Sequence, residues 1–137
     1  MDIREFDWAD YDAVYALWER LHMTKPSIDS RVALAGCLER NPGLFLVAVA
    51  ADGRPAGTVL GTFDGRRGYL YHVAVDPAYR RQGIGRALMT EIMQRLRERG
   101  AVKITLRVDR ENHSAIAFYR SVGLGADEHV LGMSIEY

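Results

Sequence analysis

The chain has 137 residues, 48% of them hydrophobic and 26% charged, and its 18 Lys and Arg residues balance 18 Asp and Glu residues. A chain of this length buries about two-thirds of its unfolded surface, so a single domain over residues 1–137 needs no metal or disulfide to fold. Neutral net charge disfavours non-specific nucleic-acid binding, which normally requires a strongly basic chain. Cys37 is the only cysteine, which excludes an intramolecular disulfide.

Neither a membrane span nor a secretion signal is expected. The longest uninterrupted apolar run, residues 44–51, is far shorter than the roughly 18 residues that a spanning helix needs. Residues 1–5 have no signal-peptide character. We therefore expect a cytoplasmic protein with no membrane partner.

The first forty residues predict one short strand and two helices. Residues 3–6 are expected to form the strand, and Asp7 can cap the first helix. A polar loop over residues 22–27 follows, and Asp29 or Ser30 can start the second helix, which an Asn-Pro-Gly sequence ends. The apolar face of the first helix consists of Tyr11, Val14, Tyr15, Trp18 and Leu21.

Three consecutive strands are predicted next, over residues 44–51, 55–63 and 69–75. Asp52 and Gly53 are expected to form a two-residue hairpin turn between the first two strands. Consecutive strands joined by short turns favour antiparallel pairing.

The last half of the chain alternates helices and strands, which indicates an α/β domain. Residues 102–108 and 130–135 are predicted strands, and Asn112 can cap a helix between them. The helix expected before residue 102 has the clearest apolar face in the chain, formed by Ile84, Leu88, Met89, Ile92, Met93 and Leu96.

A basic turn with two glycines joins a strand to an amphipathic helix in residues 73–89. The first turn of a helix carries unpaired N–H groups and a partial positive charge, and Gly83 and Gly85 let a phosphate approach closely. The sequence is neither the dinucleotide fingerprint nor a Walker loop, and a glycine pair alone is often structural. The whole string predicts a pyrophosphate site, with added positive charge from Arg80, Arg81 and Arg86.

Two motifs resemble those of the GNAT N-acetyltransferase superfamily. In this chain, Arg80-x-x-Gly83-x-Gly85 follows a Val-Ala-Val-Asp-Pro strand end and is similar to the acetyl-CoA motif of the family. The later string Asn112-x-x-Ala115-x-x-x-Tyr119-x-x-x-Gly123-Leu124 is similar to the family's next motif, with Leu124 in place of the usual Phe.

The resemblance implies an α/β (α+β) GNAT fold: a mixed, mostly antiparallel sheet of six to seven strands, flanked by four helices and splayed between strands four and five, residues 69–75 and 102–108. It implies acetyl-CoA as cosubstrate in the cleft and no metal. A β-bulge near Val73 would aim an N–H at the thioester oxygen. The implied cofactor contacts are Val73, Ala74, Val75, Arg80, Arg81, Gln82, Gly83, Ile84, Gly85, Arg86, Asn112, Ala115 and Tyr119.

The resemblance makes Tyr119 the general acid that protonates the departing thiolate. A buried aromatic pair with Phe118 is the alternative interpretation. An amine with a pKa of about 10 must also lose a proton before it attacks. Tyr69 stands where some relatives carry a strand-four glutamate, and Arg107 stands where ribosomal-protein acetyltransferases carry one on strand five.

His72 and Tyr71 are therefore the strand-four candidates for the base, and strand alternation predicts that they point to opposite faces. Imidazole is the side chain best suited to exchange a proton near neutral pH, which favours His72, although a packed histidine is the alternative. Asp109 and Glu111 are other candidates, and a water chain or a neutral acceptor would leave no side-chain base.

The leading hypothesis is transfer of an acetyl group to a primary amine of a small molecule or peptide by direct attack. An inactive CoA-binding sensor, favoured by the missing carboxylates, and an acyltransferase for longer acyl-CoA are the alternatives. Residues 80–107 carry eight basic against two acidic side chains, and residues 1–19 carry six acidic against one basic, so the acidic segment would steer cationic acceptors. Residues 130–135 could pair two copies as a homodimer.

Overall fold

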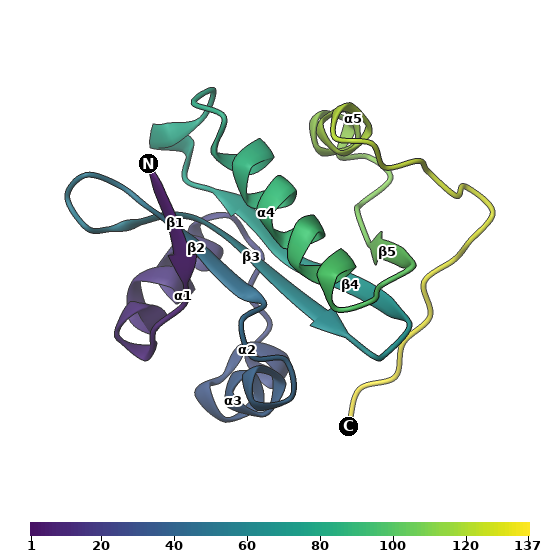
Figure 1. Ribbon diagram of the computed structural model, residues 1–137, viewed down its shortest axis with the longest axis horizontal. Coiled ribbons are helices and arrows are strands. Elements are labelled where there is room, and N and C mark those ends of the chain that lie inside the picture. The colour runs from purple at the N-terminus through teal and green to yellow at the C-terminus, as the bar shows by residue number, and fades with distance from the viewer. The chain divides into compact units, whose positions relative to one another are not determined.

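A five-stranded sheet runs through the computed structural model, which describes residues 1–137 (Figure 1). The strand order is β1-β2-β3-β4-β5; β1 to β4 pair antiparallel, and β5 runs parallel to β4. The strands are β1 (Asp2–Glu5), β2 (Phe45–Val49), β3 (Pro55–Phe63), β4 (Arg67–Val75) and β5 (Lys103–Leu106). The mixed, mostly antiparallel α/β architecture is confirmed, with five strands instead of six or seven.

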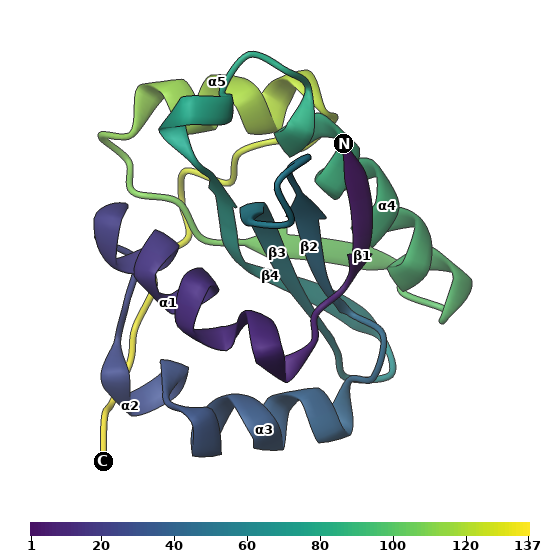
Figure 2. The same cartoon turned by 90° about the vertical axis from the view of Figure 1, so that its left-hand side faces the viewer.

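Five α-helices accompany the sheet, one more than expected, because a one-turn helix interrupts the loop predicted over residues 22–27. Two compact units make up the chain, residues 1–105 and 106–137. In the first unit, α4 lies on one face of the sheet and α1 and α3 lie on the other (Figure 2). The helices are α1 (Tyr11–Arg20), α2 (Pro26–Asp29), α3 (Arg31–Arg40), α4 (Ile84–Glu98) and α5 (His113–Ser121), with 3-10 turns at Trp8–Asp10 and Pro77–Tyr79.

Side-chain caps start the first helices where the sequence predicted them. The Asp7 carboxylate accepts a hydrogen bond from the Ala9 N–H at 2.8 Å, and Asp10 accepts one from the Asp7 N–H at 3.0 Å. Ser30 accepts one from the Ala33 N–H at 3.2 Å. These contacts satisfy N–H groups that a helix start leaves unpaired. The Ser30 cap of α3 is confirmed, whereas Asp7 caps the 3-10 turn that leads into α1, and α1 itself has no side-chain cap.

Glycines of β3 and β4 allow α4 to pack very close to the sheet. A Cβ at Gly61 would lie 2.9 Å from Ile92 Cδ1, and a Cβ at Gly68 would lie 2.8 Å from Leu96 Cδ1. Ile92 and Leu96 are fully buried, as the predicted apolar face requires. This packing fixes the direction in which α4 leaves the sheet.

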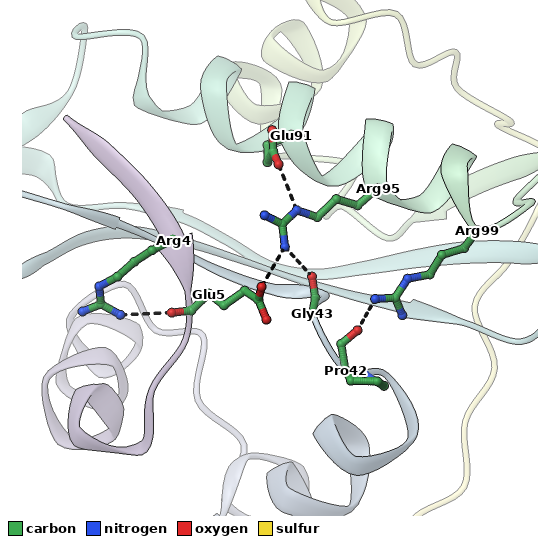
Figure 3. A network of polar contacts seen from close by, with 7 residues as sticks. All are labelled: Arg4, Glu5, Pro42, Gly43, Glu91, Arg95 and Arg99. Atoms are coloured by element: carbon green, nitrogen blue, oxygen red, sulfur yellow. Dashed lines mark hydrogen bonds and ion pairs between the residues drawn. The ribbon is translucent and has the colours of Figure 1, made fainter.

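Arg95 on α4 ties this helix to the start of β2 (Figure 3). Its guanidinium donates to the Gly43 carbonyl at 3.0 Å and pairs with Glu5 at 3.4 Å and with Glu91 at 2.9 Å. Arg99 donates to the neighbouring Pro42 carbonyl. Two arginines of α4 therefore hold the segment before β2 by hydrogen bonds to the backbone carbonyls of that segment.

The strand predicted over residues 130–135 is absent. No helix or strand follows α5, and the side chains of Val130, Leu131, Met133 and Ile135 are 64–88% exposed. Alternating apolar residues favour a strand only when another strand pairs with their backbone groups, and none does so here. The expected hairpin between β2 and β3 is present, but its turn is longer than two residues: a loop over residues 50–54 joins the strands, closed by an Ala50 N–H bond to the Arg54 carbonyl.

None of the helices has both the length and the apolar character needed to cross a membrane.

Candidate functional site

The β4 strand contains a bulge near the residue where the sequence predicted one. Leu60 of β3 pairs with Tyr71, but Thr58 pairs with Ala74, so His72 and Val73 together oppose a single β3 residue. His72 adopts a left-handed backbone conformation with φ of 49°. This conformation is uncommon for a residue with a large side chain, and the structure around it must hold it in place.

The bulge changes which face of the sheet the β4 side chains occupy. Gly68 faces α4, so Tyr69 and Tyr71, whose rings stack 4.8 Å apart, lie on the opposite face. His72 also lies on that opposite face, because its ring stacks on Trp18 of α1 at 4.0 Å. The prediction that Tyr71 and His72 point to opposite faces is therefore wrong, since a bulge breaks strand alternation.

Thr58 holds the bulge from the neighbouring strand. Its hydroxyl accepts a hydrogen bond from Trp18 Nε1 at 2.9 Å and donates one to the His72 carbonyl at 2.8 Å. Thr58 and Trp18 are completely buried, so neither group can exchange its partner for water.

Asp29 joins this site although the sequence suggested only a helix start for it. His72 Nε2 lies 2.7 Å from Asp29 Oδ1, and the other carboxylate oxygen accepts the Lys25 N–H at 2.8 Å. Tyr11 donates its hydroxyl to the Asp29 carbonyl at 2.7 Å. The Asp29 and His72 side chains are only 4% and 12% exposed. Asp29 and His72 are 43 residues apart, so no local sequence signal reports their contact.

The second half of β4, residues 71–75, has a neighbouring strand on one side only. β5 begins beside the start of β4, where the Val102 N–H bonds to the Arg66 carbonyl at 2.9 Å. β5 has four residues whereas β4 has nine, so β5 ends long before β4 does. Val73, Ala74 and Val75 therefore lie where the β4 backbone is open on the β5 side, in agreement with the predicted opening between strands four and five.

The turn after β4 leads to an open helix start. Asp76 accepts a bond from the Ala78 N–H at 3.0 Å and pairs with Arg20 of α1 at 3.0 Å. Gly83 adopts a left-handed φ of 76° as the N-cap of α4, and its carbonyl accepts the Ala87 N–H at 3.0 Å.

The composition of the first turn of α4 suits an anionic ligand. The first turn of α4 contains no acidic residue and has no side-chain cap. Arg81 adopts a left-handed φ of 65°. The unpaired N–H groups of a first helical turn, with cationic side chains around them, fit a pyrophosphate in charge and in hydrogen-bond direction. The exposed side chains of this segment are Arg80, Arg81, Gln82 and Arg86, while Ile84 is buried and Gly85 half-buried.

The remaining predicted site residues lie on or before α5 in the second unit. Asn112 caps α5 by accepting the Ala115 N–H at 3.2 Å, which confirms the cap. Tyr119 is half-buried beside Phe118, with ring centroids 5.4 Å apart, and burial raises the pKa of its phenol. A raised pKa keeps the phenol protonated, as a proton donor requires.

Two other carboxylates considered as bases are exposed residues of the loop before α5. Asp109 accepts the Glu111 N–H at 2.8 Å, which is a turn contact. Glu111 lies 3.8 Å from His113 Nε2, and both of these side chains are exposed. No group of three or more His, Cys, Asp or Glu side chains is arranged to hold a metal ion.

Comparisons with known proteins agree with this geometry. Residues 2–124 match the acetyltransferase (GNAT) family. The chain is 37% identical over 131 residues to acetyltransferase SG1711 of Sodalis glossinidius, covering 96% of this chain and 92% of that protein.

Two solved structures share the fold. The ribosomal-protein-S18-alanine N-acetyltransferase of Escherichia coli has a TM-score of 0.72 and 28% identity, covering 89% of this chain and 76% of that one. An aminoglycoside acetyltransferase, meta-AAC0020, from an uncultured soil metagenomic sample has a TM-score of 0.77 and 26% identity, covering 99% and 95%. The bulged β4 strand, the open start of α4 and these matches show that the chain belongs to the acetyltransferase (GNAT) family.

Proposed function

We propose that the protein is an acetyl-CoA-dependent N-acetyltransferase that acetylates a primary amine of a small molecule or peptide by direct attack in a ternary complex. The observation that carries this proposal is the succession along the chain of a bulge at His72 and Val73, a strand edge open on one side, and a first turn of α4 that contains no acidic residue. The first two suit an extended acyl-pantetheine chain and the third suits its pyrophosphate.

Acetyl-CoA supplies an acetyl group already activated as a thioester. Backbone groups of Val73, Ala74 and Val75 would pair with the pantetheine, and a bulge N–H would stabilise the negative charge that develops on the thioester oxygen. The N–H groups of residues 82–86 would hold the pyrophosphate, with exposed Arg80 and Arg81 at its rim.

Tyr119 is the proposed general acid. A thiolate with a pKa near about 8.5 must be protonated as it leaves, and a phenol whose pKa is raised by burial holds its proton until then. Asn112 and Ala115, which precede Tyr119 on the same segment, are the further cosubstrate contacts that the family motif suggests.

The acceptor is proposed to be a cationic amine. The two structural relatives are named for an aminoglycoside and for the alanine of a ribosomal protein, so both small molecules and peptides are represented. Six of the seven charged side chains in residues 1–19 are acidic, and this segment would attract a positively charged acceptor.

Free-thiol release from acetyl-CoA tests the proposal with four acceptors: spermidine, kanamycin, phenylethylamine and a peptide with a free N-terminal alanine. Product mass should show one acetyl group on at least one acceptor, and calorimetry should show CoA binding. CoA binding with no acetylation of any acceptor would favour a sensor. Consumption of butyryl-CoA but not acetyl-CoA would favour a longer-chain acyltransferase, and absence of CoA binding would contradict the whole proposal.

The Tyr119→Phe variant tests the acid. Loss of the phenolic proton should lower kcat about 100-fold and leave CoA affinity and the melting temperature unchanged. Tyr137→Phe, at a fully exposed position, is the matched control and should retain full turnover. Unchanged kcat in Tyr119→Phe would remove Tyr119 as the acid.

A further inference from the structure

We infer that His72 and Asp29 form a proton-accepting pair, in which His72 Nδ1 takes the proton of the acceptor amine and Asp29 is the positioning residue that holds the imidazole. This inference rests on the proposed acetyltransferase function and deepens it, because it assigns the base and adds Asp29, a residue outside the family motifs.

The contact between the two side chains fixes the position of the imidazole proton. Asp29 Oδ1 lies 2.7 Å from His72 Nε2, and the other Asp29 oxygen already accepts the Lys25 N–H. A carboxylate can only accept hydrogen bonds. The hydrogen between the two groups therefore lies on Nε2 of the neutral imidazole, and Nδ1 carries the lone pair. The nitrogen that can take a proton is therefore Nδ1.

Nδ1 is free to react. The hydrogen bond of the His72 ring is made by Nε2 to Asp29, and no protein group bonds to Nδ1. The His72 side chain is 12% exposed, so its ring is not wholly enclosed. A lone pair without a hydrogen-bond partner, in a ring that is held in place, is arranged to accept a proton from an incoming ligand.

The contacts that immobilise the His72 ring accompany an unfavourable backbone conformation. His72 adopts a left-handed φ of 49°, its ring stacks on Trp18 at 4.0 Å, and its carbonyl accepts the Thr58 hydroxyl. Strain of this kind persists only where surrounding contacts enforce it, and it is concentrated at functional sites. The next residue, Val73, is the one proposed to contact the acyl chain, so the base and the acetyl group would meet at one bulge.

Asp29 is the only charged group bonded to His72, and it belongs to α2, in the loop between α1 and α3. When Nδ1 takes a proton, the imidazolium forms beside a carboxylate that stabilises it. Tyr71, exposed on the same face, has no such partner and stacks only on Tyr69. An imidazole is also the better proton acceptor at neutral pH than a phenol, which favours His72.

Each proton that the amine loses and the sulfur gains can be assigned to a donor and an acceptor. An alkylammonium gives one proton to Nδ1, and the freed lone pair forms the C–N bond while the C–S bond breaks with its electrons on sulfur. The nitrogen loses its second proton to water as the amide forms, sulfur takes one from the proposed acid Tyr119, and water returns a proton to the phenol. His72 returns its proton to solvent through its exposed edge.

A double-mutant cycle tests the pair with the fastest amine of the panel. His72→Asn suits the left-handed backbone and should lower kcat about 100-fold. Asp29→Asn keeps the shape but not the charge and should lower kcat about 10- to 100-fold. The double variant should match His72→Asn, because Asp29 acts through His72. Losses that multiply in the double variant would overturn the assignment, since a purely structural Asp29 would act independently.

Two controls separate failure of this inference from failure of the proposed function. CoA affinity and KM for the amine should stay within about twofold in all variants, and Asp52→Asn, at an exposed carboxylate of the loop between β2 and β3, should keep full turnover. Tight CoA binding with unaltered kcat in both single variants would overturn the pair alone. Absence of CoA binding in the wild type would overturn the proposed function.

Nitrogen-15 NMR of the labelled wild-type protein gives a readout that needs no acceptor. The neutral His72 ring should carry its proton on Nε2, with the chemical shift of an unprotonated nitrogen at Nδ1. A proton found on Nδ1 in the neutral ring would contradict the assignment directly.

Discussion

Replacing Thr58 by valine tests whether hydrogen bonds, and not only packing, hold the β4 bulge. Valine has nearly the same shape, but it removes the acceptor of Trp18 Nε1 and the donor to the His72 carbonyl. Thr58 and Trp18 are fully buried, so water cannot replace either bond. Each buried polar group left unpaired costs about 1–3 kcal/mol, and we expect Thr58→Val to lower the free energy of unfolding by about 3 kcal/mol.

Thr58→Ser is the matched control, because serine keeps both hydrogen bonds and loses one buried methyl group, worth about 1 kcal/mol. Equilibrium urea unfolding, followed by far-UV circular dichroism, measures both variants against the wild type, with the m-value expected to stay constant. The valine variant should be the less stable of the two. A valine variant as stable as the wild type, or more stable than the serine variant, would refute the account of the bulge.

Three further predictions concern the packing and charges around the sheet. Gly57→Ala should lower the free energy of unfolding by about 2 kcal/mol in urea titration, because its Cβ would lie 2.9 Å from a backbone oxygen of β4; a neutral effect would show that the strands separate easily. Arg95→Ala should lower it by about 1 kcal/mol and the exposed Arg97→Ala by less than about 0.5, and equal effects would contradict the network of Figure 3. The guanidinium of Arg4 holds the pKa of Asp10 below its usual 3.8, so this contact stabilises the fold above about pH 4 and is lost as the pH falls through the lowered value. Arg4→Met should remove that part of the acid dependence in thermal melts between pH 5 and pH 2, and an unchanged profile would exclude the pair as its source.

The elements with strong local periodicity were predictable from the sequence. The apolar face of α4 and its open start follow from spacing within fifteen residues, and the structure places Leu88 and Ile92 in the core as expected. The caps Asp7, Ser30 and Asn112 likewise depend on neighbours two or three residues away.

Features that depend on distant partners were not predictable. The apolar alternation over residues 130–135 suits a strand, but a strand also needs a neighbour, which no local pattern supplies. The bulge was expected near Val73 from the resemblance, yet its effect on the side chains of Tyr71 and His72 was not. The contact between His72 and Asp29 joins β4 to α2 across 43 residues, so only the folded chain reveals it.

Amide NMR during a titration with CoA tests the central claim, that the β4 bulge and the start of α4 together bind acetyl-CoA. The largest chemical-shift changes should occur at the N–H groups of Val73, Val75, Ile84 and Gly85, and they should saturate together with a single dissociation constant. Saturable shifts confined to other parts of the chain, or no shifts at millimolar CoA, would show that acetyl-CoA does not bind there.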